Sequence, residues 1–483
     1  MGRERLGSVL VALMILTLVA GCSTTGTNDI SPPYHDEASD YSHLSYLEAF
    51  DALYLRLERE YAFTEWKGID WKGLRERYRP LIADAEKEED AQAYYLALRS
   101  FIYAIQDRHV SISSMAAVDD AAIAGGFGIA AALLDDRRLV ITWVDEQSAA
   151  QSAGLEPGQV IDTIDSRQAW DAVLDVEPLF VSKAATDDEL LQNKALQRFR
   201  APIGTVMTLG VGNAAVTLYA YDDGRRSLQH SYPDAVVSDA LRSAMLGRED
   251  LPLPTSMVEY YTPREGVLSI KVWGLFDADL TASGTLVPTL DQWRAAIDTA
   301  IAQETKLLIV DLRNNVGGLD ELSARMLGSF YEAPTLYERL NTFVPQTGTR
   351  ALMRFGSEEG IFITAAPSIY TGKIVALTNY RTVSSGEGLA MGIKRLENGE
   401  TLGFWGTNGS FGLAGCEAMM GEGIIIRWPS GQSLDERYMI QLDSRDGTGG
   451  VSPSIRIAWD LDRALAVSQG IDVEFNEALR LAP

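Results

Sequence analysis

Cysteine is nearly absent from this sequence, which has only Cys22 and Cys416 among its 483 residues. Two cysteines allow at most one disulfide, so the fold depends on a hydrophobic core, for which apolar residues at 46% of the chain suffice. We interpret Cys416 as an ordinary buried thiol. No spacing of histidine, cysteine, aspartate and glutamate resembles a set of metal ligands, so we expect neither a metal nor another cofactor.

Positive charge is also scarce. Lysine and arginine together number 42 against 67 aspartates and glutamates, which leaves a formal net charge of −25. The electrostatic field of such a chain repels phosphate backbones and anionic lipid surfaces. Nucleic acid is therefore not an expected partner.

Long apolar runs are missing, since no stretch reaches the roughly 20 residues that cross a bilayer. A shorter run from Val9 to Ala20 follows two arginines and precedes Cys22, which is typical of an export signal. The sequence L-V-A-G-C resembles the bacterial lipoprotein box, which implies cleavage before Cys22 and acylation of this residue. Ser23 implies sorting to the outer membrane, facing the periplasm, with the lipid anchor as the only membrane contact. An ordinary secretory signal is the alternative.

The rest of the chain falls into regions of different periodicity. Apolar residues at helical spacing, such as Leu47 with Phe50 and Leu98 with Phe101, predict a small helical unit. Short β-type runs follow, and the C-terminal half has a βαβ rhythm that predicts a parallel sheet covered by helices. We therefore divide the chain into a signal peptide (1–22), a polar tether (23–43), a helical domain (44–118), a β domain (119–240) and an α/β core (258–483).

Two predicted strands of the core end in residues suited to catalysis, and open α/β sheets gather their sites at such strand ends. The strand KLLIVDL runs into R-N-N-V-G-G, whose glycines either donate N–H groups to a ligand or form a plain turn. The strand KIVALTN runs into Y-R-T-V-S-S-G-E-G, where Ser384 and Glu387 have the S-x-x-E spacing of a capping box. Ser384 is either a helix cap, the commoner role, or a nucleophile whose oxyanion the helix N-terminus stabilises.

Six blocks of the sequence occur in an order typical of one family. They are EYAFTEWKGIDWKGLRERYRP, IYAIQDRHVSIS, VDLRNNVGG, TVSSGEG, GTNGSFG and GGVSPSIRI. Together with the β domain they resemble the carboxyl-terminal processing and tricorn-type serine peptidase family over residues 44–483. The resemblance implies a mixed α/β protein with an N-terminal helical unit, a PDZ-like β domain and a ClpP/crotonase-like α/β protease core. It also implies a serine-type hydrolase that cleaves proteins or peptides.

The resemblance assigns catalytic roles to individual residues. Ser384 is the nucleophile, and the amides of Ser385 and of the glycine pair, with Gly318 as the first choice, form the oxyanion hole. One branch of the family uses a lysine base, but the matching block 406–412 contains no lysine. The tricorn-like branch uses a histidine, and His109 is the only well-placed one of four. An imidazole titrates near neutral pH, as a general base should.

The third catalytic member is indicated less sharply. Asp446 is the carboxylate nearest to the family's G-V-x-P turn, and Asp443 is the second candidate. Arg108 and Ser454 stand where the family has a small polar residue and an aspartate, so a catalytically inactive, peptide-binding scaffold of the same fold is an alternative. His109 would then only offset the partial negative charge at the C-terminal end of a helix. A crotonase-like acyl-CoA enzyme is a further alternative, although the export signal and the PDZ-like region speak against it.

The segment GGFGI at 125–129 resembles the loop with which PDZ domains receive a peptide carboxylate. This implies that Gly126, Phe127, Gly128 and Ile129 bind substrate tails through backbone groups. The alternative is a glycine-rich strand entrance in a domain that only braces its neighbours. Taken together, the sequence predicts a periplasm-facing lipoprotein serine endopeptidase that acts on protein or peptide substrates.

Overall fold

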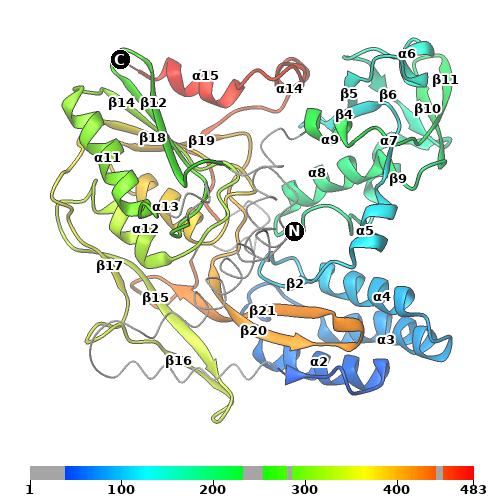
Figure 1. Ribbon diagram of the computed structural model, residues 1–483, viewed down its shortest axis with the longest axis horizontal. Helices are drawn as coiled ribbons and strands as arrows, with labels where there is room; N and C mark the ends of the chain where they lie inside the picture. Colours follow the sequence, from blue (N-terminus) through cyan, green and yellow to red (C-terminus); the bar gives the residue numbers. More distant parts are fainter. Residues whose placement is uncertain (1–38, 232–253, 279, 281–285, 442–449, 483) are drawn as a thin grey trace, which may run out of the picture.

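The computed structural model describes residues 39–231, 254–278, 280, 286–441 and 450–482. It shows a mixed α/β protein, as predicted, with N-terminal helices, a β-rich part and a larger α/β core (Figure 1). Cys22, Asp443 and Asp446 lie outside the described residues. Among the helices that are described, none is both long and apolar enough to pass through a bilayer.

A six-stranded sheet forms the centre of the core. Its neighbouring strands are parallel except for β12 and β13, which are antiparallel. The alternation of apolar strands with helices in the sequence predicted this arrangement. In order across the sheet, the strands are β12 (Val258–Arg264), β13 (Val267–Val272), β14 (Leu307–Asp311), β18 (Lys373–Leu377), β19 (Gly399–Gly403) and β22 (Ile455–Arg456).

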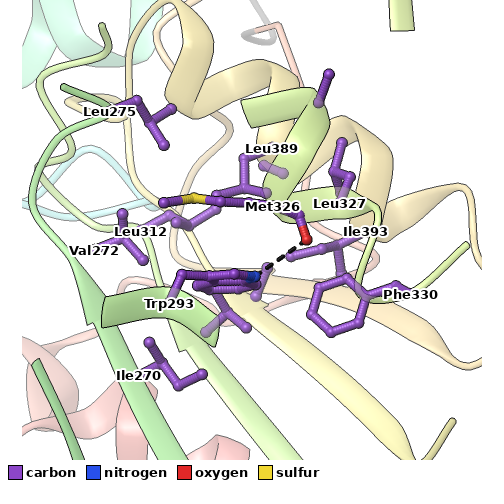
Figure 2. Packing of buried hydrophobic residues seen from close by; sticks show 14 of the residues in the cluster. Ile270, Val272, Leu275, Trp293, Leu312, Met326, Leu327, Phe330, Leu389 and Ile393 are labelled. Atoms are coloured by element: carbon purple, nitrogen blue, oxygen red, sulfur yellow. Dashed lines mark hydrogen bonds between the residues drawn. The ribbon is translucent and has the colours of Figure 1, made fainter. Parts of the chain in front are cut away.

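Helices cover both faces of this sheet because its central strands are apolar on both sides. Along β14, Leu308 and Leu307 point into different clusters of buried side chains. The first cluster surrounds Trp293, whose indole Nε1 donates to the Met326 carbonyl oxygen at 3.1 Å (Figure 2). The helices on this side are α11 (Thr289–Ala302), α12 (Asp320–Leu327) and α13 (Ser385–Lys394), and those on the other side are α14 (Leu461–Ser468) and α15 (Val473–Arg480).

A second sheet joins the N-terminal helices to the core. The helices α2 (Tyr46–Glu60), α3 (Trp71–Lys87) and α4 (Ala91–Tyr103) pack against the hairpin of β20 (Gly412–Met419) and β21 (Ile425–Leu434), which lies beside them in Figure 1. Trp428 of the hairpin is fully buried in their cluster, and Cys416 is buried there as well, as predicted. The helices and the hairpin thus share one hydrophobic core. The sheet also contains β1 (Ser39–Asp40), β2 (Ser111–Ile112), β15 (Thr335–Val344), β16 (Thr349–Leu352) and β17 (Ile361–Ile363).

Residues 125–231, which we call the insert, form the β-rich part at the upper right of Figure 1. The short β-type runs expected for this region are present as strands, among them β5 (Leu139–Val144) in RRLVITWV and β10 (Val206–Val211) in GTVMTLGV. His230, one of the three histidines that the sequence analysis set aside, lies in a helix, and its ring stacks on Trp143 with centroids 4.3 Å apart. The small sheets comprise β4 (Ile129–Leu133), β5 (Leu139–Val144) and β6 (Val160–Ile161); β7 (Thr163–Ile164), β8 (Arg167–Gln168), β10 (Val206–Val211) and β11 (Ala214–Tyr219); and β3 (Gly125–Gly126) with β9 (Arg200–Ala201). The helices are α6 (Ala149–Ser152), α7 (Ala169–Leu174), α8 (Asp187–Arg198) and α9 (Arg226–Ser231).

Candidate active site

Ser384 occupies the turn between β18 and α13. Its backbone has a φ of 58° and a ψ of −129°, a combination that residues with a side chain rarely adopt. Such strained residues persist only where their surroundings impose the conformation, and they are concentrated at functional sites. Ser384 is partly exposed, whereas residues 381–383 before it and 385–393 after it are buried. The turn therefore presents one serine to solvent at the start of a buried helix.

Glu387 holds this turn in place, as the S-x-x-E spacing predicted. Its carboxylate accepts hydrogen bonds from the Ser384 amide at 3.1 Å, and from the Thr407 hydroxyl, the Gly409 amide and the Ser410 amide at 2.7, 2.6 and 3.0 Å. Burial raises the pKa of Glu387 to about 7, although these hydrogen bonds act in the opposite direction. Because Glu387 binds the backbone of Ser384 and not its hydroxyl, a capping role and a nucleophilic role for this turn are compatible.

The loop that follows β14 lies against the Ser384 turn. The two loops leave adjacent parallel strands, and the Val383 amide donates to the Asn315 carbonyl at 3.2 Å. Gly317 comes close to Ser384, since a Cβ on Gly317 would lie 2.8 Å from the Ser384 Cβ. Gly318 has a φ of 147°, and a Cβ there would collide with the backbone of Leu275. Only glycine fits these two positions, so the G-G pair permits the close approach.

Two backbone amides beside Ser384 make no hydrogen bond within the described part of the chain, namely those of Gly318 and Ser385. The Leu275 amide donates to the Gly317 carbonyl, and the Leu275 carbonyl accepts from the Leu319 amide. The amide of Gly318, which lies between these two residues, takes no part in the pairing. The Ser385 hydroxyl lies 2.9 Å from the Gly318 carbonyl oxygen and so links the two segments. Free amides at a helix N-terminus suit the negative charge of a tetrahedral intermediate. These are the two residues that the sequence predicted for an oxyanion hole.

His109 lies in a turn between α4 and β2. The sequence placed it at the end of a helix, but α4 ends six residues earlier, at Tyr103. The turn is fixed by Asp107, whose Oδ1 accepts from the His109 amide at 2.9 Å and lies 3.9 Å from the His109 Nδ1. The other oxygen of Asp107 accepts from the Tyr61 hydroxyl at 2.8 Å. The His109 side chain is 15% exposed, so it is mostly buried but still accessible to solvent.

Asp107 is a site residue that the sequence analysis missed. Burial pushes the pKa of Asp107 upward, but the charges of Lys67, His109 and Lys183 and the His109 amide outweigh it and hold the pKa below its usual value. The carboxylate is therefore ionised beside the imidazole. A signal for it was present, because an aspartate two residues before another residue commonly accepts that residue's amide in a turn.

Ser410 connects the His109 turn with the Ser384 turn. Its hydroxyl accepts from the Arg108 amide at 3.0 Å, and its carbonyl oxygen accepts from the Ser384 amide at 3.2 Å. Arg108, which precedes His109, and Ser384 are thus both hydrogen-bonded to Ser410, which is fully buried. The structure in this way brings together two residues that lie in the first and last thirds of the chain.

Two carboxyl groups, those of the partly buried Asp320 and the fully buried Glu338, lie behind the Ser385 hydroxyl, which donates to an oxygen of Asp320 at 2.7 Å. Burial raises the pKa of Asp320 to about 6, and burial together with the Asp320 charge raises the pKa of Glu338 well above its ordinary value. Glu338 is therefore the member that keeps its proton at neutral pH. Both native pKa values exceed the unfolded values of about 4, so the stability from this pair is complete below about pH 4. The contribution of Asp320 is lost as the pH rises through about 6, and that of Glu338 persists to a higher pH.

Replacing Glu338 by glutamine should leave the free energy of unfolding at pH 7 within about 1 kcal/mol of the wild-type value, because glutamine copies the protonated side chain. Urea unfolding followed by circular dichroism at pH 7 measures this. Glu338→Ala is the matched control and should be clearly less stable, since it removes the acceptor of the Ser433 hydroxyl, now at 2.6 Å. Equal, large losses in both variants would mean that Glu338 is ionised in the native state.

The predicted peptide-binding loop is partly committed to internal contacts. The Gly126 amide donates to the Tyr221 carbonyl at 2.9 Å, so in this conformation it is not available to a carboxylate, contrary to the prediction. The reason is that Gly126 forms an antiparallel bridge with Tyr221 in addition to its pairing with Arg200 of β9. Phe127 and Ile129 have buried side chains in the hydrophobic cluster of the insert. Among the predicted donors, the amides of Phe127 and Gly128 remain as candidates.

Comparison with known proteins identifies the family. Residues 266–456 match the model of peptidase family S41, and residues 42–93 match the tricorn protease C1 domain. The chain contains a peptidase family S41 domain. It is therefore a serine-type hydrolase, as the sequence predicted. A search of curated proteins found no match. Within the described residues of this S41 peptidase, no group of three or more His, Cys, Asp or Glu side chains could hold a metal ion.

Solved structures with the same fold include two that span nearly the whole chain. Mature CPAF in complex with lactacystin superposes with a TM-score of 0.62 at 13% identity, covering 91% of this chain and 97% of CPAF. A protein from Parabacteroides merdae described as a peptidase superposes with a TM-score of 0.50 at 13% identity, covering 91% of this chain and 96% of its own. At these identities the likeness establishes the fold alone. This fold is the mixed α/β fold that the sequence predicted.

Proposed function

We propose that this S41 peptidase is an endopeptidase in which Ser384 is the nucleophile and His109 the general base. The observation that carries the proposal is the position of Ser410, which binds the backbone of Ser384 and of Arg108. His109 takes the proton of the Ser384 hydroxyl as the oxygen attacks the peptide carbonyl, and gives it to the leaving amine. It then activates the water that hydrolyses the acyl enzyme.

The amides of Gly318 and Ser385 would hold the oxyanion of the tetrahedral intermediate. Neither amide has another partner among the described residues, so neither must give up a hydrogen bond when charge develops. The partial positive charge at the N-terminus of α13 adds to their effect. For the group that orients the base we propose Asp446, with Asp443 as the second candidate. Asp107 acts differently, because it fixes the His109 backbone and lies beyond hydrogen-bond distance of the ring.

Digestion of a mixed peptide library by the purified protein tests the endopeptidase assignment. We expect products cut at internal peptide bonds, identified by mass spectrometry, because the proposed chemistry requires no terminal group of the substrate. Stepwise removal of single terminal residues would contradict the assignment. Lactacystin, the compound bound in the CPAF structure, is a suitable compound to test for inhibition.

We further propose that the insert recruits substrate tails through its 125–129 loop, with the amides of Phe127 and Gly128 as donors to the terminal carboxylate. Peptides with a free C-terminus should therefore bind more tightly than the same peptides with a C-terminal amide, by on the order of tenfold, because the amide removes the charge. Fluorescence anisotropy with both forms measures the difference. Equal affinities would mean that the insert takes internal segments or is a brace, a role that the packing of α14 of the core against β5 and α9 of the insert would also suit.

The cellular location belongs to the same proposal. Acylation of Cys22 would anchor the protein in the bacterial outer membrane. The predicted tether ran to residue 43, but Ser39 and Asp40 pair with β20, so the polar residues between Cys22 and Ser39 would hold the peptidase away from the lipid on the periplasmic side. A catalytically inactive, peptide-binding scaffold is the alternative. The partial exposure of Ser384 favours the enzyme, because a serine kept only as a helix cap has no need of access to solvent.

A further inference from the structure

Two buried charged side chains of the insert contact the residues on either side of His109. The Lys183 Nζ donates to the Val110 carbonyl oxygen at 2.7 Å, and Glu189 accepts from the Arg108 guanidinium at 3.0 Å. Lys183 is 7% exposed and Glu189 is fully buried. The backbone that carries the imidazole is therefore held from both sides by one short segment of the insert, residues 183–189.

Glu189 also reaches the loops around Ser384. Its second carboxylate oxygen accepts from the Asn408 side-chain amide at 2.8 Å, and this amide also donates to the Tyr380 carbonyl at 2.8 Å. The backbone amide of Asn408 donates to the Thr382 carbonyl at 2.9 Å. Thr382 lies two residues before Ser384. One carboxylate thus joins the base turn to the nucleophile turn.

Hydrogen bonds within residues 183–189 hold Glu189 in place. Glu189 lies in the first turn of α8, where its amide donates to the hydroxyl of the capping residue Thr186 at 3.2 Å. Its carboxylate also accepts from the Ala185 amide at 3.2 Å. Burial lowers the pKa of Lys183, although the nearby Asp107 charge opposes this shift. Buried charges cost desolvation energy and add little net stability, so a conformational role explains this arrangement better than a stabilising one.

We infer that Lys183 and Glu189 are positioning residues for catalysis, which clamp the His109 turn and set its distance from Ser384. This inference rests on the proposed roles of His109 and Ser384. The insert would then contribute to catalysis by positioning His109, in addition to binding substrate. Displacement of a catalytic group by about 1 Å can lower a rate about 100-fold, so loss of either clamp contact should be visible in kcat.

The first experiment compares Lys183→Met and Glu189→Gln with the control Lys194→Met. Lys194 is a matched control because it also lies in α8 and donates to backbone carbonyls, but these belong to Leu174 and, at 2.8 Å, to Val176, which are remote in sequence from both active-site turns. We expect the two clamp variants to lose about 10- to 100-fold in kcat and in the rate of fluorophosphonate labelling, with KM changed less than about twofold. The control should keep wild-type kcat. Equal kcat in all four proteins would overturn the inference.

Two more variants separate positioning from other roles. Lys183→Gln keeps a donor for the Val110 carbonyl but cannot act as a base, so we expect it to recover most of the activity lost in Lys183→Met. If Lys183→Gln is as inactive as His109→Gln, Lys183 is itself the base and the inference is wrong. Arg108→Met combined with Glu189→Met removes both charges and should regain thermal stability but not kcat. Recovery of kcat in this double variant would show that the pair is only structural.

Hydrogen exchange distinguishes failure of the clamp from failure of the proposed chemistry, because it needs no turnover. In Lys183→Met and Glu189→Gln, amides of residues 107–112 and 380–384 should exchange faster, while the rest of the core matches wild type. Lys194→Met should leave both segments unchanged. Unaltered exchange in the clamp variants would reject the inference even if the wild type is active. Faster exchange in an inert wild-type background would keep the clamp and reject the catalytic roles.

Discussion

Replacement of Ser384 by alanine is expected to lower peptide hydrolysis by about 10⁴-fold or more, to the background of binding and oxyanion stabilisation alone. The reason is that the hydroxyl is the only group from which the acyl enzyme can form in the proposed mechanism. The neighbouring amides and the helix N-terminus stay in place, so KM should change little. Initial rates with a fluorogenic peptide, for variant and wild type, measure the loss.

The adjacent serine provides the control for this substitution. Ser385→Ala removes a hydroxyl that lies near the Gly318 carbonyl and Asp320, but it keeps the Ser385 amide. We expect a loss of about tenfold or less from Ser385→Ala, since only the alignment of the loop is affected. If Ser385→Ala is inactive while Ser384→Ala retains activity, the nucleophile has been assigned to the wrong serine.

Replacement of His109 by glutamine should lower kcat by about 10²- to 10⁴-fold, the usual contribution of a general base. Glutamine is similar in size and its backbone can still donate to Asp107, so the turn should keep its shape. The same variant should fail to accumulate an acyl enzyme in rapid-quench experiments. Wild-type circular dichroism of the variant would show that the loss is chemical and not a loss of fold.

Two lysines serve as controls for the identity of the base. Lys394 donates to the Ser452 carbonyl at 2.7 Å, and Lys373 begins β18 at the edge of the sheet opposite to Ser384. We expect Lys394→Met and Lys373→Met to keep acyl-enzyme formation largely intact. Loss of acylation in either lysine variant, with activity retained in His109→Gln, would reverse the assignment.

Local sequence patterns were sufficient to predict the elements that carry Ser384. Runs of apolar and β-branched residues predicted β14 and β18, and the S-x-x-E spacing predicted the start of α13. Because adjacent parallel strands end at the same edge of a sheet, the glycine pair and Ser384 were expected to meet there. Gly317 and Gly318 confirm that the close approach needs residues without a side chain.

Contacts between distant segments could not be predicted in this way. The His109 turn reaches Ser410 because the N-terminal helices pack on the β20–β21 hairpin, and no local pattern encodes that packing. In the sequence, Lys183 and Glu189 resemble surface charges, since charged residues are rarely buried. The amide of Gly126 was expected to be free because its pairing partner, Tyr221, lies far along the chain.

The central claim is that Ser384 is acylated with the help of His109, and one measurement tests it most directly. Purified wild type and His109→Gln are incubated with a fluorophosphonate, and the adduct is located by intact-mass and peptide-mapping mass spectrometry. The account predicts one adduct per wild-type chain, on Ser384, and labelling of His109→Gln slowed by at least about 100-fold. A folded wild type that stays unlabelled, or an adduct on a residue other than Ser384, would contradict it.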